Sequence, residues 1–276
     1  MVGTGPGDGT SAATPLWASL GVQLNTIFAD QGLPNLGYMN DLLYIAAAIK
    51  PDDEHFARTR LLALENTLGG RVLPMPYLAE ATALARRHGL ATHLDGARLF
   101  NAAVALAATD GGDARAQAKA MASHFDSVSV CFSKGLGAPV GSALVGSAEL
   151  IARAHRLRKM LGGGMRQAGV LAAAGLYALA HNLPRLAEDH EHATALAAAL
   201  AEIPGVTVVP PDTNIVLFDL APPLPDADTV LKALAPRGVL GGAFGPRRVR
   251  LVTHLDVDAA ACRRAAEQIR GLLCGA

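Results

Sequence analysis

The spacing of hydrophobic positions alternates along the chain between the period of a strand and that of a helix. Short apolar or alternating runs predict strands at residues 60–65, 91–94, 127–131 and 142–145, and the first of these is expected to be buried. Helical spacing or composition predicts helices at residues 41–50, 76–88, 97–107 and 148–159, with a surface loop at 109–115. Strands that alternate with helices favour an α/β fold with a mostly parallel sheet covered on both faces.

The pattern changes near residue 183. Upstream of it, residues 167–184 predict a buried, alanine-rich helix; downstream, the order becomes α+β, with helices and strands at 186–201, 206–209, 215–218, 227–235, 248–252 and 258–273. We therefore predict three parts: an irregular tail at 1–20, a large domain at 21–182 and a smaller α+β domain at 183–276.

Composition narrows the class of protein. Of the 276 residues, 51% are apolar and 17% charged, which predicts a large core and favours surface hidden in an oligomer. Lys+Arg and Asp+Glu balance at 24 each, so we expect neither a nucleic-acid nor a membrane partner. The first residues lack the pattern of a secretory signal, and a cytoplasmic location is expected.

Cysteine and histidine positions argue against metal and disulfide sites. The three cysteines, Cys131, Cys262 and Cys274, are odd in number and lack CxxC spacing, so neither a disulfide framework nor a zinc site is expected. His190 and His192 stand two apart on a predicted helix and point to different sides, which favours a capping or surface role. No metal is expected.

Residues 125–146, FDSVSVCFSKGLGAPVGSALVG, predict a buried strand, a glycine-rich turn and a second buried strand. Lys134 lies on the turn beside Ser133. Desolvation between two buried strands would lower the pKa of its amine and favour the neutral form that makes Schiff bases. The alternative is a lysine on an exposed hairpin loop, and this segment alone leaves both open. The glycines lack the spacing of a dinucleotide-binding loop.

A second group of polar residues follows the strand at 91–94. Asp95 stands where that strand ends, the place where parallel sheets bind ligands, and Arg98 is three residues further on. The alternatives are that Asp95 caps the next helix and that Arg98 pairs with it. Together with Lys134, an aspartate at this place has the chemistry that pyridoxal phosphate needs, a carboxylate for the pyridine nitrogen and an amine for a Schiff base.

Five motifs, in order, resemble low-specificity L-threonine aldolases from about residue 21 onward. They are LENT (64–67), HLDGARLFNA (93–102), FDSVSVCFSKGLGAPVGS (125–142), RKMLGGGMRQAGVLAAA (158–174) and RLVTHLDV (250–257). The resemblance implies the pyridoxal-phosphate (PLP)-dependent transferase-like fold, also called aspartate-aminotransferase-like or fold type I. It implies retro-aldol cleavage of L-threonine or L-allo-threonine to glycine and an aldehyde. It also implies a homo-oligomer, dimer or tetramer, with its site at a subunit interface.

The resemblance also implies roles for single residues. Lys134 becomes the Schiff-base lysine, Asp95 the partner of the pyridinium nitrogen, and Ser133 a cofactor contact. Arg98 would lie close to the cofactor ring or the substrate.

Three further basic residues match the family's pattern. Arg250 would clamp the substrate carboxylate, a bidentate role that suits a guanidinium. Lys159 and Arg166 would lie near the cofactor phosphate, some of these contacts being made across the dimer interface.

Two departures from the family stand out. Leu68 occupies the place of a histidine that touches the substrate hydroxyl, so the base is unassigned; another histidine or a water could substitute. Residues 1–20 lack the family's phosphate turn and ring-stacking histidine, which predicts a shortened large domain. The alternatives are another PLP-dependent β-eliminating lyase, or a catalytically silent, truncated homologue that acts as an oligomer partner.

Overall fold

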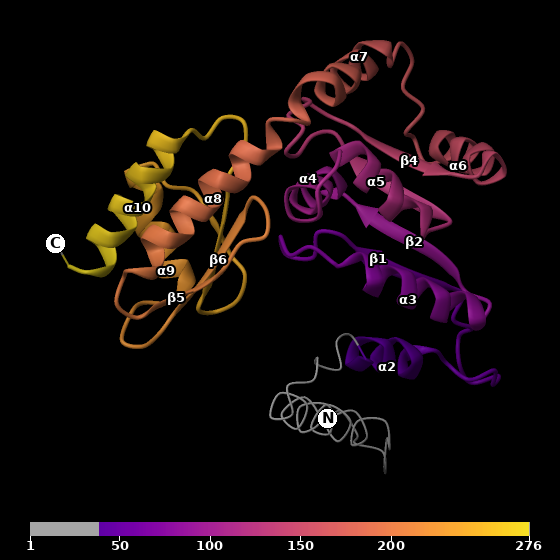
Figure 1. Ribbon diagram of the computed structural model, residues 1–276, viewed down its shortest axis with the longest axis horizontal. Helices are drawn as coiled ribbons and strands as arrows, with labels where there is room; N and C mark the ends of the chain where they lie inside the picture. The colour runs from indigo at the N-terminus through magenta and orange to yellow at the C-terminus, as the bar shows by residue number, and fades with distance from the viewer. Residues whose placement is uncertain (1–38, 276) are drawn as a thin grey trace. The chain divides into compact units, whose positions relative to one another are not determined.

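The computed structural model describes residues 39–275, and the tail predicted at 1–20 lies outside them (Figure 1). The chain divides into two compact units. Of the first, the structure describes residues 39–62 and 74–92; of the second, residues 63–73 and 93–275. The predicted domain boundaries at 20 and 182 stay predictions.

The first unit contains the helices α2 (Met39–Ala48) and α3 (Met75–Arg87), which confirm the helices predicted there. The apolar face predicted for α3 is buried at Leu78, Ala81 and Ala85. The helix ends before Gly89, whose φ of +67° lets the chain turn so that Leu90 N donates to Ala85 O at 3.0 Å.

A mostly parallel sheet has the strand order β1-β2-β3-β4. Its strands are β1 (Leu61–Glu65), β2 (Ala91–Gly96), β3 (Ser127–Cys131) and β4 (Ser142–Gly146). Strands β2 and β3 pair in parallel with Asp95 opposite Ser129, whereas β3 and β4 pair antiparallel. A Cβ at Gly96 would lie 2.8 Å from Ser129 O, so the end of β2 requires a residue without a side chain.

The burial predicted for β1 and β4 was wrong. Leu61 in β1 and Val145 in β4 are exposed, because these two strands are the outer members of the sheet order. The inner strands β2 and β3 instead bury Leu94, Val128 and Val130. Short apolar runs do not distinguish an inner strand from an edge strand.

The helices of the second unit begin with α4 (Leu99–Asp110) and α5 (Ala114–Ser123). The surface loop predicted at 109–115 was too long, because the Asp113 carboxylate accepts a hydrogen bond from Ala116 N at 3.1 Å and starts α5. Next come α6 (Ala148–Met160), α7 (Gly169–Tyr177) and a π-helical turn, Ala178–Asn182. The prediction of a buried helix was wrong for α7, in which Gly175 is the buried residue.

The C-terminal part forms an antiparallel sheet with the order β5-β6-β8-β7. Its strands are β5 (Val206–Val209), β6 (Ile215–Leu220), β7 (Gly242–Ala243) and β8 (Arg248–Val252). The helices are α8 (Leu186–Ala201), α9 (Ala227–Leu234) and α10 (Ala259–Leu273), with a 3-10 turn at Ala235–Arg237. One hydrophobic core joins the three helices to the sheet, as Figure 1 lets the reader follow. The α+β arrangement predicted after residue 183 is confirmed.

Among the described helices, none has the combination of length and apolar character that a membrane span requires.

Candidate active site

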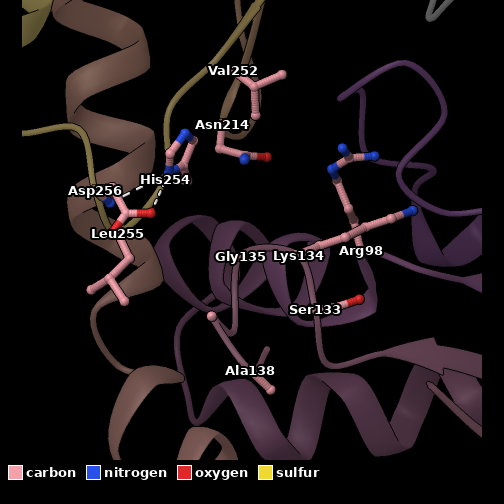
Figure 2. Close-up of a pocket in the computed structure, with 11 residues that line it drawn as sticks. Arg98, Ser133, Lys134, Gly135, Ala138, Asn214, Val252, His254, Leu255 and Asp256 are labelled. Atoms are coloured by element: carbon pink, nitrogen blue, oxygen red, sulfur yellow. Dashed lines mark hydrogen bonds and ion pairs between the residues drawn. The ribbon is translucent and has the colours of Figure 1, made fainter. Parts of the chain in front are cut away.

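A pocket of about 400 Å³ opens in the second unit. Its walls come from Arg98 before α4, the loop at 133–138 after β3, Asn214 before β6, Val252 at the end of β8, and residues 254–256 after that strand. Figure 2 shows Arg98 and Lys134 on one side and Asn214 and His254 on the other. Three of the predicted site residues, Arg98, Ser133 and Lys134, therefore share one pocket, whose volume suits a small-molecule ligand.

The loop that carries Lys134 is closed by its own backbone. Gly137, at a φ of +71°, donates its N–H to Lys134 O at 2.8 Å, and Ala138 N donates to Phe132 O at 2.9 Å. Lys134 is exposed, so the prediction that two buried strands desolvate it was wrong: β4, which follows the loop, is an edge strand. Of the two readings of this segment, the exposed hairpin loop describes the local geometry.

The loop rests on a polar pair, buried Asn101 and part-buried His190. A Cβ at Gly135 would lie 3.1 Å from Asn101 Oδ1, so the loop backbone packs directly on this buried side chain of α4. Asn101 Nδ2 lies 3.2 Å from His190 Nε2 on α8. Burial lowers the pKa of His190 to about 4, which keeps its imidazole neutral at neutral pH.

Arg98 presents an unused donor. Its Nε is buried and has no hydrogen-bond partner among residues 39–275. Burial lowers the pKa of the Arg98 guanidinium, and the positive charge of Arg250 lowers it further, whereas Glu65 opposes both. Arg250 stands two residues before Val252 on β8, so both side chains leave the same face of the strand, and Val252 lines the pocket. Two guanidiniums thus lie close enough to repel, an arrangement that favours binding of an anion between them.

Asp95 lies at the end of β2 and is exposed. Its Oδ1 accepts a hydrogen bond from Ala97 N at 3.1 Å, which shapes the turn into α4. The alternative of a helix cap was wrong, because Arg98 holds the cap position of α4. Within the described part of the chain, no ion pair joins Asp95 to Arg98, and Asp95 does not line the pocket.

The LENT segment attaches to this strand end. Asn66 is buried, its N–H donates to Asp95 O at 3.0 Å, and its Oδ1 accepts from Leu73 N at 3.1 Å. Leu68, which replaces the family's histidine, is 55% exposed. This backbone hydrogen bond holds Asn66 of LENT beside Asp95.

Lys159 and Arg166 are placed elsewhere. Lys159 lies in the last turn of α6 and Arg166 in the segment before α7; both are exposed. Neither lines the pocket that contains Lys134.

Sequence reasoning missed part of the pocket. Asn214, His254 and Asp256 line it, although only His254 and Asp256 belong to a recognised motif. The local signal for Asn214 was a polar pair, Thr213 and Asn214, directly before the buried run of β6. Both residues are buried, and buried polar side chains in native proteins have partners or functions.

Helix α8 connects the two walls of the pocket. On the side of the Lys134 loop, His190 of α8 contacts Asn101. On the side of Asn214 and His254, Thr253 Oγ1 donates to Asp189 O of α8 at 2.6 Å. The buried Asp189 carboxylate pairs with Arg185 at 2.5 Å, and burial raises the pKa of Asp189 while the arginine opposes the rise. The walls are thus supported by one helix.

The sequence profile of the beta-eliminating lyase family matches residues 16–222. The chain belongs to this family. The resemblance to low-specificity L-threonine aldolases is confirmed as well: the chain is 49% identical over 214 residues to the low specificity L-threonine aldolase of Escherichia coli K12, covering 78% of this chain and 60% of that one. It is 44% identical over 225 residues to low-specificity L-threonine aldolase 1 of Arabidopsis thaliana, covering 79% and 61%.

Solved structures agree on the fold. A threonine aldolase of Leishmania major superposes with a TM-score of 0.64 at 21% identity, covering 83% of this chain and 65% of that one. The predicted fold class is therefore confirmed. Beta-eliminating lyases and threonine aldolases are PLP-dependent families. The chain spans about 60% of the length of the two curated relatives named above.

Proposed function

We propose that this beta-eliminating lyase is a PLP-dependent aldehyde-lyase. It cleaves L-threonine and L-allo-threonine to glycine and an aldehyde. The observation that carries the proposal is the pocket in which Lys134 and Ser133 face Arg98. The positive charge of Arg250 lies close enough to act on the Arg98 guanidinium. An amine beside two guanidiniums suits a ligand that has both a carbonyl and a carboxylate.

Arg98, Ser133 and Lys134, which line the pocket, fit the cofactor. The buried Nε of Arg98 requires an acceptor, and the phenolic oxygen of PLP is one. Lys134 would hold the cofactor covalently, with Ser133 as a further contact and Asp95 as the partner of the pyridinium nitrogen. When bound, PLP draws electrons from the Cα–Cβ bond that breaks.

The chain's own side chains would orient the substrate. Arg250 binds the substrate carboxylate in a bidentate pair, and Arg98 shares this anion. Since residue 68 is leucine, the hydroxyl proton needs another base, and His254 is the imidazole among the pocket-lining residues. A His254→Gln variant with the parent's pH–rate profile would exclude this role.

Lys159 and Arg166 belong to a second part of the proposal, a homo-oligomer. Both lie in a region with many exposed apolar side chains, which we define as the apolar arm. It comprises Val140, Leu144, Val145, Leu157, Met160, Leu161, Met165, Val170, Leu176 and Tyr177. Large exposed apolar surface marks interaction sites, so a second copy of this chain would cover the arm and receive the two basic residues near its cofactor phosphate. The three cysteines are free, and we place the protein in the cytoplasm.

The test starts from the purified chain reconstituted with PLP. The parent is expected to show a visible absorption band of lysine-bound cofactor and to release glycine from L-threonine. Lys134→Ala removes the amine and is expected to abolish both, whereas Lys119→Ala, at an exposed position of α5, leaves both unchanged. A parent protein without the band would contradict the proposal.

The family name favours a second candidate, elimination at Cβ of another amino acid. Product analysis with threonine, serine and phenylserine separates the two reactions. Retro-aldol cleavage gives glycine from all three, whereas elimination gives a keto acid and ammonia from threonine and serine.

A further inference from the structure

Asn214 is the most constrained polar side chain of the pocket. It is 2% exposed and lies directly before β6, in the wall opposite Lys134. Its Oδ1 is buried and accepts no hydrogen bond within residues 39–275. An unpaired buried acceptor costs free energy, so native proteins rarely retain one without a use.

The orientation of the amide is determined by its other end. Nδ2 donates to Thr253 O at 2.8 Å, and a flipped amide would place two oxygens against each other. Oδ1 is therefore the end left for the pocket, and Figure 2 shows it directed toward the side of Arg98. The site offers an acceptor fixed in place and already desolvated.

Such an acceptor selects a ligand group that donates a hydrogen bond. A carboxylate cannot donate a hydrogen bond, so it is not the group that Oδ1 selects. The amino group of the substrate is engaged where Lys134 lies. The remaining donor on a β-hydroxy-α-amino acid is its hydroxyl group.

We infer that Asn214 is the specificity-determining residue that accepts the hydrogen bond of the substrate's β-hydroxyl group. This rests on the proposed function and adds to it how the hydroxyl is recognised when residue 68 is leucine. The single hydroxyl hydrogen points to Asn214 when the substrate binds and turns to His254 when the proton is removed. The backbone carbonyl of Thr253 positions Asn214, since it accepts the hydrogen bond of Nδ2 at 2.8 Å. A pocket with a buried acceptor rejects analogues that leave the acceptor unpaired.

The test compares two ligands that differ by one oxygen. Binding of L-threonine and of L-2-aminobutyrate to the PLP-loaded protein is measured by rapid mixing, from the change in cofactor absorbance that each ligand causes before L-threonine is cleaved. In the parent, threonine is expected to bind about 5- to 10-fold more tightly, the value of one hydrogen bond to a buried acceptor. In Asn214→Ala the two ligands are expected to bind equally.

Two controls separate recognition from folding. Thr253→Val loses the bond to Asp189 O but leaves Oδ1 of Asn214 in place, so it is expected to lower the melting temperature and keep the preference. If Asn214→Ala does not fold, Asn214→Leu fills the same space without an acceptor.

The outcomes distinguish this inference from the proposed function. If both ligands bind Asn214→Ala with the parent's preference, the inference is overturned and the proposed function stands. If neither ligand binds the loaded parent, the proposed function fails and the inference falls with it.

Discussion

The apolar arm exposes its apolar side chains, whereas the C-terminal α+β region buries its own in a core. In the arm, Leu161 is 86% exposed, and within the described part of the chain α6 buries none of its residues. In the C-terminal region, Phe218, Leu234 and Val249 are completely buried in one core. The spacing of apolar residues therefore shows which surface has to be buried. Only the folded chain shows whether that surface is buried within the same chain or is left for another molecule.

Three measurements can sharpen or break this comparison. The largest effect is expected in the C-terminal core. Phe218→Ala removes a fully buried ring from β6 and should lower the free energy of unfolding by about 3–5 kcal/mol. Leu176→Ala in the arm should change it by less than about 0.5 kcal/mol in urea titrations of dilute, monomeric protein. Equal losses would show that the arm is buried in the monomer.

The second largest effect is a loss of stability at low pH, caused by the part-buried imidazole of His190. The folded pKa of His190, about 4, lies below its ordinary value near 6.5, so the unfolded chain binds more protons between these values. The stabilising effect of the neutral imidazole is present above pH 6.5 and is lost as pH falls toward 4. The free energy of unfolding falls by up to about 3 kcal/mol over this range.

A His190→Gln variant isolates this contribution. Glutamine can still bond Asn101 but does not titrate, so its free energy of unfolding should fall less steeply than the parent's between pH 6.5 and 4. Asp189, whose pKa burial raises, is present in both proteins and cancels in the difference. Parallel pH profiles in urea titrations would contradict the prediction.

The smallest effect in free energy is expected at the surface of the arm. Leu161→Asp places a charge in the proposed interface and should weaken self-association by about 10- to 100-fold, as measured by light scattering across a dilution series. Leu240→Asp is the matched control, since Leu240 is 79% exposed outside the arm. If both variants keep the parent's mass, the arm is not the interface.

Much of the fold could be predicted from the sequence because local patterns carry it. Helix α3 has a regular apolar face and ends before Gly89, and helix α10 begins at the capping side chain of Asp258. Strand β8 was predicted with the bounds that the structure has. The motifs around Lys134 and Arg98 also identified three residues that share the pocket. Helix α5 was not predicted from the sequence, because its start depends on the side chain of Asp113 rather than on an apolar period.

The sequence by itself determined the order of the elements and the identity of the charged groups, since both follow from local spacing and residue chemistry. Tertiary structure alone decided that β4 is an edge strand, that Lys134 is exposed, and that Asn214 presents a buried oxygen to the pocket. The physical reason is that burial and hydrogen-bond partners depend on segments far apart in the chain. The Asn214 amide is oriented by Thr253, 39 residues away, and no local pattern records that contact.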